Sequence, residues 1–198
     1  MIIKKTEFIK SCSKPEACPE TDKPEFAFVG RSNVGKSSLL NMLANNRKLA
    51  KTSSTPGKTR LINYFLINDA WLLVDLPGYG YARTGKSERK GFLSLIKGYL
   101  LKRQNLYCLF VLIDCRHKPL ASDLEFIEWL GVNRVPFVIC FTKTDKLSSY
   151  ALTKNTEIYK AELNKTWDML PEMFFASVPE CSGRDELLGF INGAIQQI

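Results

Sequence analysis

Short apolar runs alternate along the chain with segments in which apolar residues recur every three or four positions. The apolar runs predict six β-strands, at 26–29, 61–67, 71–74, 106–113, 137–141 and 173–176. Helical spacing predicts helices over 92–100, 120–130 and 187–195, and one more after Ser148. Strands that are apolar throughout, separated by amphipathic helices, indicate an α/β fold in which helices cover both faces of a mostly parallel six-stranded sheet.

The length and composition favour one domain. The chain has 198 residues, of which 45% are hydrophobic, enough for one substantial core. The first 25 residues contain three prolines and equal numbers of acidic and basic residues. We therefore expect residues 1–23 to form a loosely ordered arm and residues 24–198 to form the domain.

The six cysteines and the apolar runs bear on location. The cysteines lack the dense spacing of a disulfide scaffold, which favours reduced thiols in the cytoplasm. The N-terminus has no apolar targeting segment, and the longest apolar run, 106–113, is far shorter than a membrane span. We expect a cytoplasmic protein with no membrane span, and a monomer.

The net charge of +8 is concentrated in two segments. Residues 47–60 carry five basic residues and no acid, and residues 86–103 carry six basic residues and one acid, so each segment contributes +5. This concentration suggests contact with a polyanion, although a run of like charges is also typical of a solvated surface. The charge alone leaves both interpretations open.

A glycine-rich loop follows the first predicted strand. The sequence GRSNVGKS, residues 30–37, matches the pattern GxxxxGK[ST] between a strand and a helix. Its backbone N–H groups and the helix N-terminus can surround phosphates, Lys36 adds a mobile positive charge, and Ser37 offers a hydroxyl to Mg²⁺. The loop therefore predicts binding of a nucleoside triphosphate.

Three further strand ends carry motifs that are weak alone and informative in this order. The strand 71–74 runs into Asp75-Leu-Pro-Gly78, which suits magnesium and a terminal phosphate, and the strand 137–141 runs into Thr142-Lys-Thr-Asp145. A carboxylate in the second motif can accept from both N1–H and the exocyclic amine of guanine. The strand 173–176 ends in Phe-Ala-Ser, where the Ala176 N–H can donate to the guanine carbonyl.

A basic segment broken by glycine and proline, 53–61, precedes the second predicted strand, where a switch segment is expected. Thr55 or Thr59 can supply a second hydroxyl to magnesium, and we favour Thr59.

Together the motifs GRSNVGKS, TPGKTRLINYF, DLPGYGYA, TKTD and FAS make residues 24–198 resemble a translation-factor-type P-loop GTPase, and specifically the EngB (YihA, YsxC) family of small bacterial GTPases. The resemblance implies a GTP- and magnesium-dependent factor that assists assembly of the large ribosomal subunit and is needed for normal cell division and septation. Its implied partners are the large ribosomal subunit or its precursor and rRNA. It implies catalytic roles for Lys36 and Thr59 and magnesium contacts at Ser37 and Thr59. Its implied guanine nucleotide contacts are Gly30, Arg31, Ser32, Asn33, Val34, Gly35, Lys36 and Ser37, then Gly57, Lys58, Thr59, Arg60 and Leu61, then Asp75, Leu76, Pro77 and Gly78, then Thr142, Lys143, Thr144 and Asp145, and finally Phe175, Ala176 and Ser177.

Two departures from better-known GTPases shape the expected mechanism. The guanine motif begins with Thr142 where asparagine is most common, and Tyr79 stands where many GTPases have a glutamine that orients the attacking water. We expect weak intrinsic hydrolysis, stimulated by a partner or by K⁺, for which Asn33 is the candidate ligand. Two other functions stay open: a nucleotide-gated interaction protein at the division site without a direct ribosome role, and a P-loop kinase of small substrates.

Overall fold

The computed structural model describes residues 1–47, 49–50, 61–79 and 86–197, and among these the side chains of all but 86–90. Seven strands are present in this part of the chain: β1 (Thr6–Cys12), β2 (Glu25–Gly30), β3 (Ile62–Ile67), β4 (Trp71–Asp75), β5 (Leu106–Asp114), β6 (Phe137–Thr142) and β7 (Met173–Ala176). Its α-helices are α1 (Lys36–Leu43), α2 (Lys86–Lys102), α3 (Ala121–Val132), α4 (Ser149–Leu163) and α5 (Arg184–Ile195). Two short 3₁₀ turns, Pro15–Ala17 and Thr144–Lys146, are also present among the described residues.

The strands form one sheet in the order β1-β3-β4-β2-β5-β6-β7. β3 runs antiparallel to both of its neighbours, and the other pairs are parallel. The six predicted strands and the α/β class are confirmed. The number of strands was wrong, because the sheet has a seventh.

The extra strand, β1, lies in the segment expected to be a loosely ordered arm. It pairs along β3 from Thr6 to Cys12, and the Phe8 ring lies 5.8 Å from that of Phe65. The expectation of a loosely ordered arm is therefore corrected for these residues. Because β1 is an edge strand with only Cys12 fully buried, its sequence lacks the continuous apolar run that revealed the inner strands.

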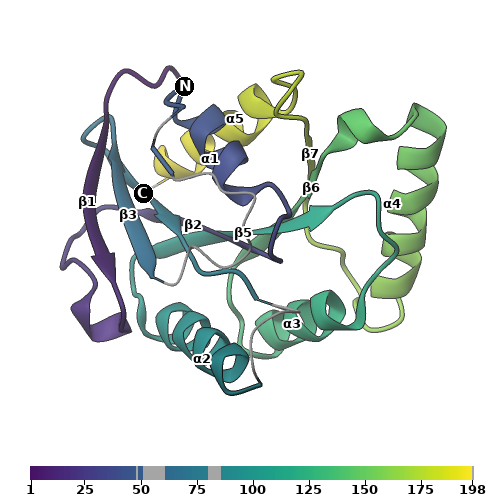
Figure 1. The fold of residues 1–198 in the computed structure, drawn as a ribbon, viewed down its shortest axis with the longest axis horizontal. Coiled ribbons are helices and arrows are strands. Elements are labelled where there is room, and N and C mark those ends of the chain that lie inside the picture. The colour runs from purple at the N-terminus through teal and green to yellow at the C-terminus, as the bar shows by residue number, and fades with distance from the viewer. Residues whose placement is uncertain (48, 51–60, 80–85, 198) are drawn as a thin grey trace.

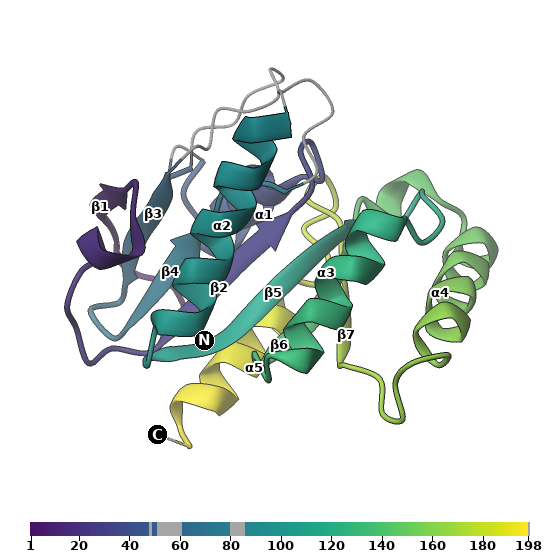
Figure 2. The ribbon, with the colours of Figure 1, turned by 90° about the horizontal axis from the view of Figure 1, so that it is seen from below.

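Two layers of helices cover the sheet, as the sequence predicted (Figure 1). Phe26 and Phe28 of β2 face the core under α1 and α5, whereas Ala27 and Val29 face the core under α2, α3 and α4. This alternation follows from the two-residue period of a strand. Figure 2 shows α2 and α3 side by side across the face of the sheet that contains Ala27 and Val29.

The parallel strands place their carboxyl ends at one edge of the sheet. The segments that follow β2, β4, β5, β6 and β7 therefore begin at this edge, where open α/β sheets bind ligands. Within the described part of the chain, no helix is both long enough and apolar enough to cross a membrane.

Candidate nucleotide-binding site

The glycine-rich loop joins β2 directly to α1. Gly35 has a φ of +100°, which favours glycine, and a Cβ on Gly30 would lie 2.9 Å from the carbonyl oxygen of Leu112. Asn33 also has a positive φ, of +62°. The two glycines thus allow the tight loop that the motif predicts.

Lys36, the first residue of α1, is paired with Asp75 at the end of β4. Its ammonium donates to the Asp75 carboxylate, and the two residues are 8% and 2% exposed. The second carboxylate oxygen of Asp75 lies 3.4 Å from the amide nitrogen of Asn63 on β3. The Ser37 hydroxyl follows on α1, so hydroxyl and carboxylate oxygens, the ligands that Mg²⁺ prefers, come from adjacent elements.

The segment after Asp75 lies against the glycine-rich loop. The N–H of Leu76 donates to the carbonyl of Phe28 over 3.0 Å, and the N–H of Tyr79 donates to the carbonyl of Gly30 over 3.2 Å. A Cβ on Gly78 would lie 3.1 Å from the same Gly30 carbonyl. Two motifs separated by more than 35 positions therefore share one wall of the site.

Tyr79 turns its side chain into the core. It is 5% exposed, and its ring centroid lies 4.7 Å from that of Phe126 on α3. Burial raises the pKa of the Tyr79 hydroxyl well above its ordinary value. Tyr79 is therefore a buried neutral phenol packed against α3.

The segment after β6 is held to the glycine-rich loop by two side chains. The Thr142 hydroxyl donates to the carbonyl of Val34 over 2.6 Å, and the Lys143 ammonium donates to the carbonyl of Asn33 over 2.6 Å. Thr142 is 4% exposed, so its hydroxyl acts as a structural donor inside the site. The first of these bonds gives a structural role to the threonine that stands where asparagine is more common.

Asp145 bridges the segments after β6 and β7. Its carboxylate accepts from the Ser177 hydroxyl over 2.9 Å and pairs with Lys146 over 2.9 Å. Hydrogen bonds from Lys146 and then Ser177 lower the pKa of Asp145, so the group is ionised at neutral pH. Phe175 stacks on Phe141 with centroids 5.5 Å apart, which holds the end of β7 beside β6.

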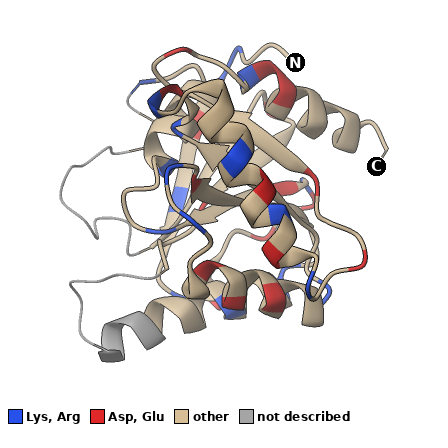
Figure 3. Cartoon of the chain, turned by 90° about the vertical axis from the view of Figure 1, so that its right-hand side faces the viewer, with Lys and Arg blue, Asp and Glu red and all other residues tan. Residues whose placement is uncertain are grey.

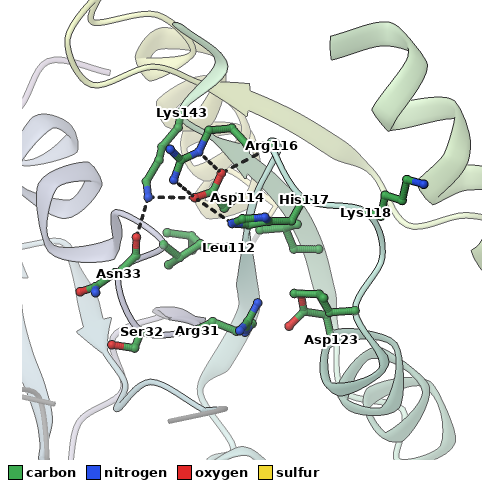
Figure 4. Close-up of a pocket in the computed structure, with 13 residues that line it drawn as sticks. Arg31, Ser32, Asn33, Leu112, Asp114, Arg116, His117, Lys118, Asp123 and Lys143 are labelled. Atoms are coloured by element: carbon green, nitrogen blue, oxygen red, sulfur yellow. Dashed lines mark hydrogen bonds and ion pairs between the residues drawn. The ribbon is translucent and has the colours of Figure 1, made fainter. Parts of the chain in front are cut away.

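Asp114, at the end of β5, was missed in the sequence analysis. It accepts two hydrogen bonds from the Arg116 guanidinium, over 2.8 and 2.7 Å, and pairs with Lys143 over 2.8 Å (Figure 4). Burial alone would raise the pKa of Asp114, but the bonds from Arg116 and Lys143 lower it below its usual range. Its signal in the sequence was an acid directly after the longest apolar run.

The structure thus brings the phosphate-loop, Asp75–Gly78, Thr142–Asp145 and Phe175–Ser177 segments together at one edge. Leu61 is exposed and directly precedes β3. The predicted contacts at Gly57, Lys58, Thr59 and Arg60 lie outside the described residues.

Comparison with known proteins agrees with this arrangement. Residues 25–143 match a family model described as a 50S ribosome-binding GTPase. The probable GTP-binding protein EngB of Porphyromonas gingivalis is 54% identical over 198 residues, covering 100% of this chain and 98% of the relative. The protein of the same description from Christiangramia forsetii is 54% identical over 193 residues, covering 98% of each.

Solved structures share the fold at lower identity. The crystal structure of a probable GTP-binding protein engB has a TM-score of 0.65 and 21% identity, covering 88% of this chain and 100% of the other. Era in complex with MgGDPNP and nucleotides of 16S ribosomal RNA has a TM-score of 0.67 and 21% identity, covering 87% of this chain and 56% of the other. On the strength of the matching motifs, fold and full-length relatives, the chain belongs to the EngB family of GTP-binding proteins and is a P-loop GTPase.

Proposed function

We propose that this GTPase is a nucleotide-switched cytoplasmic factor in assembly of the large ribosomal subunit, and that it is needed for normal cell division and septation. The observation that carries the switch is the buried Lys36–Asp75 pair, because it joins the phosphate loop to the segment that follows β4. The description of the matching family as 50S ribosome-binding supports the choice of partner. The six cysteines, all free thiols, support the cytoplasmic location.

The proposed phosphate contacts are residues 30–37 and 75–78. The backbone N–H groups of the loop surround the phosphates, and Lys36 exchanges its partner Asp75 for the terminal phosphates. That exchange frees the Asp75 carboxylate at the moment when triphosphate arrives. The segment that follows Asp75 therefore senses whether the third phosphate is present.

Magnesium fits the oxygen donors of this site. The Ser37 hydroxyl and the Asp75 carboxylate would hold it, with Thr59 as the proposed second hydroxyl. When bound, Mg²⁺ neutralises charge that develops on the transferred phosphoryl group. The task left to Lys36 is to hold the phosphates in line for attack by water.

Guanine is the proposed base. The ionised Asp145 accepts from the base N1–H and exocyclic amine, and the stem of Lys143 covers one face of the ring. Ser177 donates to Asp145 and so fixes the orientation of the carboxylate. The N–H groups of the 175–177 segment are proposed to meet the guanine carbonyl, which disfavours adenine because adenine has an amine there.

Hydrolysis is proposed to be slow without help. Tyr79 is buried, its ring packs against Phe126 of α3, and it supplies no amide to orient water. Asn33, which is exposed on the loop, is the proposed ligand of a potassium ion that would neutralise charge between the phosphates. The ribosome is the alternative source of stimulation.

The partners of the charged side chains indicate which of the two basic segments is the better candidate for the proposed ribosomal contact. In the segment 86–103, Lys102 pairs with Glu16, Arg103 pairs with the buried Glu25, and Lys97 lies 4.5 Å from the ring centroid of Trp129. These three cations already have partners within the protein, so this segment offers fewer available charges than its composition suggests. Arg47, in the other basic segment, is exposed.

α4 serves as a reference surface. Figure 3 shows basic and acidic positions alternating along the helix at the centre of the view, where Lys160 pairs with Glu157 over 2.9 Å. Such a mixed surface has little net attraction for RNA phosphates. We therefore place the proposed RNA contact near the first basic segment rather than on α4.

Co-sedimentation with large-subunit precursors tests this function. The protein should bind in the presence of Mg²⁺ and a non-hydrolysable GTP analogue and dissociate with GDP. Arg47→Gln should weaken binding and reduce the slope of log affinity against log salt by about 0.7–0.9, because one phosphate contact is lost. The matched variant Lys154→Gln, at an exposed position on α4, should leave both the affinity and its salt dependence unchanged. Equal sedimentation with the GTP analogue, with GDP and without nucleotide would contradict the proposal and favour a role away from the ribosome.

A further inference from the structure

A cavity lies beside the phosphate loop. It has a volume of about 150 Å³ and is lined by residues 31–34 on one side and by the segment from the end of β5 to the start of α3 on the other. Figure 4 shows Arg31 and Asp123 reaching into it from opposite sides. The roles proposed above use the backbone of residues 31–34 and the side chains of Asn33 and Lys143, but none of them uses the Arg31 guanidinium or Asp123.

The base of the cavity holds a buried acceptor and a buried donor. Asp123 is 3% exposed, and its Oδ1 has no hydrogen-bond partner in the described part of the protein; its Oδ2 lies 3.5 Å from the Tyr159 hydroxyl. The Nε of Arg31 is likewise buried without a partner among the described residues. Because unsatisfied buried polar groups are costly, this pairing of acceptor and donor points to a ligand that can satisfy both.

The charges around the cavity favour an anion. Its lining contains four cations, Arg31, Arg116, Lys118 and Lys143, against the two acids Asp114 and Asp123. Asp114 is already bound by Arg116 and Lys143, so Arg31 is the cation of the lining that is best placed to meet a ligand. An anion that meets Asp123 must nevertheless carry a hydrogen, because two bare negative oxygens would repel.

We propose that this cavity binds inorganic hydrogen phosphate, whose oxygens accept from Arg31 while its remaining hydroxyl donates to Asp123. The dianion present at neutral pH keeps one hydrogen, whereas sulfate and the dianion of a phosphate monoester keep none. Inorganic phosphate is also a product of GTP hydrolysis, and the cavity shares residues 31–34 with the phosphate loop. The site therefore retains the product anion next to the position where it forms. This inference rests on the GTPase family and not on a ribosomal role.

The test compares three anions on protein loaded with Mg²⁺ and a non-hydrolysable GTP analogue, so that the phosphate loop is already filled. Inorganic phosphate, sulfate and methyl phosphate are titrated at pH 7.5, and the ¹⁵N–¹H signal of Arg31 Nε is followed by NMR. Phosphate should shift this signal with saturation, and the other two anions should bind at least about tenfold more weakly, since each leaves Asp123 without a donor.

Two variants separate this reading from general attraction to positive charge. Asp123→Asn should abolish the discrimination, because an amide can donate to sulfate as well as to phosphate. Glu128→Gln removes the same charge from an exposed position on the same helix and should preserve the discrimination. Absence of saturable phosphate binding to the native protein would overturn the proposal. Equal binding of sulfate and phosphate to the native protein would also overturn it, because Asp123 would then not select the anion that carries a hydrogen.

Discussion

The buried pair of Lys36 and Asp75 makes a prediction for the protein without nucleotide. Replacing Lys36 with Met keeps most of the side-chain volume but leaves a carboxylate that is 2% exposed without its cation. Its remaining contact, to Asn63 at 3.4 Å, is too long to compensate. Removing one partner of a buried ion pair costs about 3–5 kcal/mol. The expected loss in melting temperature is about 6–12 °C at the lower of these values, for a domain of this size.

The assay is urea unfolding of four nucleotide-free proteins: native, Lys36→Met, Asp75→Asn and the double variant. The double variant should be more stable than the sum of the single effects predicts, because no unpaired charge remains, giving a coupling of about 2 kcal/mol or more. Lys154→Met, at an exposed position on α4, should change the free energy of unfolding by about 0.5 kcal/mol or less. A Lys36→Met protein as stable as the native one, or single effects that simply add, would refute the reasoning.

Three more results follow from particular contacts. Gly183→Ala should lower the melting temperature, because Gly183 has a φ of +76° and an added Cβ would lie 1.9 Å from the carbonyl oxygen of Phe175. Gly189→Ala, inside α5 with open space around the added Cβ, should raise the free energy of unfolding by up to about 1 kcal/mol. Equal shifts of the two variants in thermal melts would contradict this. The lowered pKa of Asp114 means that its ion pairs stabilise the fold above the unfolded-state pKa of about 3.9, and that this stability is lost as pH falls. Asp114→Asn should therefore flatten the dependence of the unfolding free energy on pH below about pH 4. The same pH dependence in this variant as in the native protein would contradict the prediction. Turnover should be faster in potassium chloride than in sodium chloride at equal ionic strength, and Asn33→Ala should remove the difference; equal native rates in the two salts would exclude the potassium role.

Much of the fold follows from local sequence pattern. The inner strands are apolar throughout because both of their faces are buried, so β2, β4, β5 and β6 were recognisable without tertiary information. A helix was predicted after Ser148, and Ser148 is the N-cap of α4: its hydroxyl accepts from the N–H of Ala151 over 3.3 Å. β1 was missed because an edge strand with one buried residue carries no such signal.

The candidate site was also predictable from the sequence only in part. The glycine-rich loop encodes its own geometry, so Gly30 and Gly35 were predictable from spacing alone. The partners of charged groups were not, because they come from distant segments: Lys36 meets Asp75 across 39 positions, and Lys143 meets Asp114 across 29. A sequence indicates that a carboxylate stands at the end of a strand, but which cation it meets depends on how the strands are ordered in the sheet.

The central claim, that the loops at this edge of the sheet recognise guanine, is tested most directly by the affinities of GTP and XTP for the native protein and Asp145→Asn. Xanthine has an oxygen where guanine has its exocyclic amine, so an asparagine amide can donate to it while the aspartate cannot. The account predicts that the native protein prefers GTP, and that Asp145→Asn loses at least about 100-fold in GTP affinity, for two hydrogen bonds to a charged acceptor, and gains affinity for XTP. Glu157→Gln, at an exposed position on α4, should behave as the native protein. Unchanged GTP affinity in Asp145→Asn, or an equal loss of GTP and XTP binding, would contradict the account, because Asp145 would then serve only its contacts with Ser177 and Lys146.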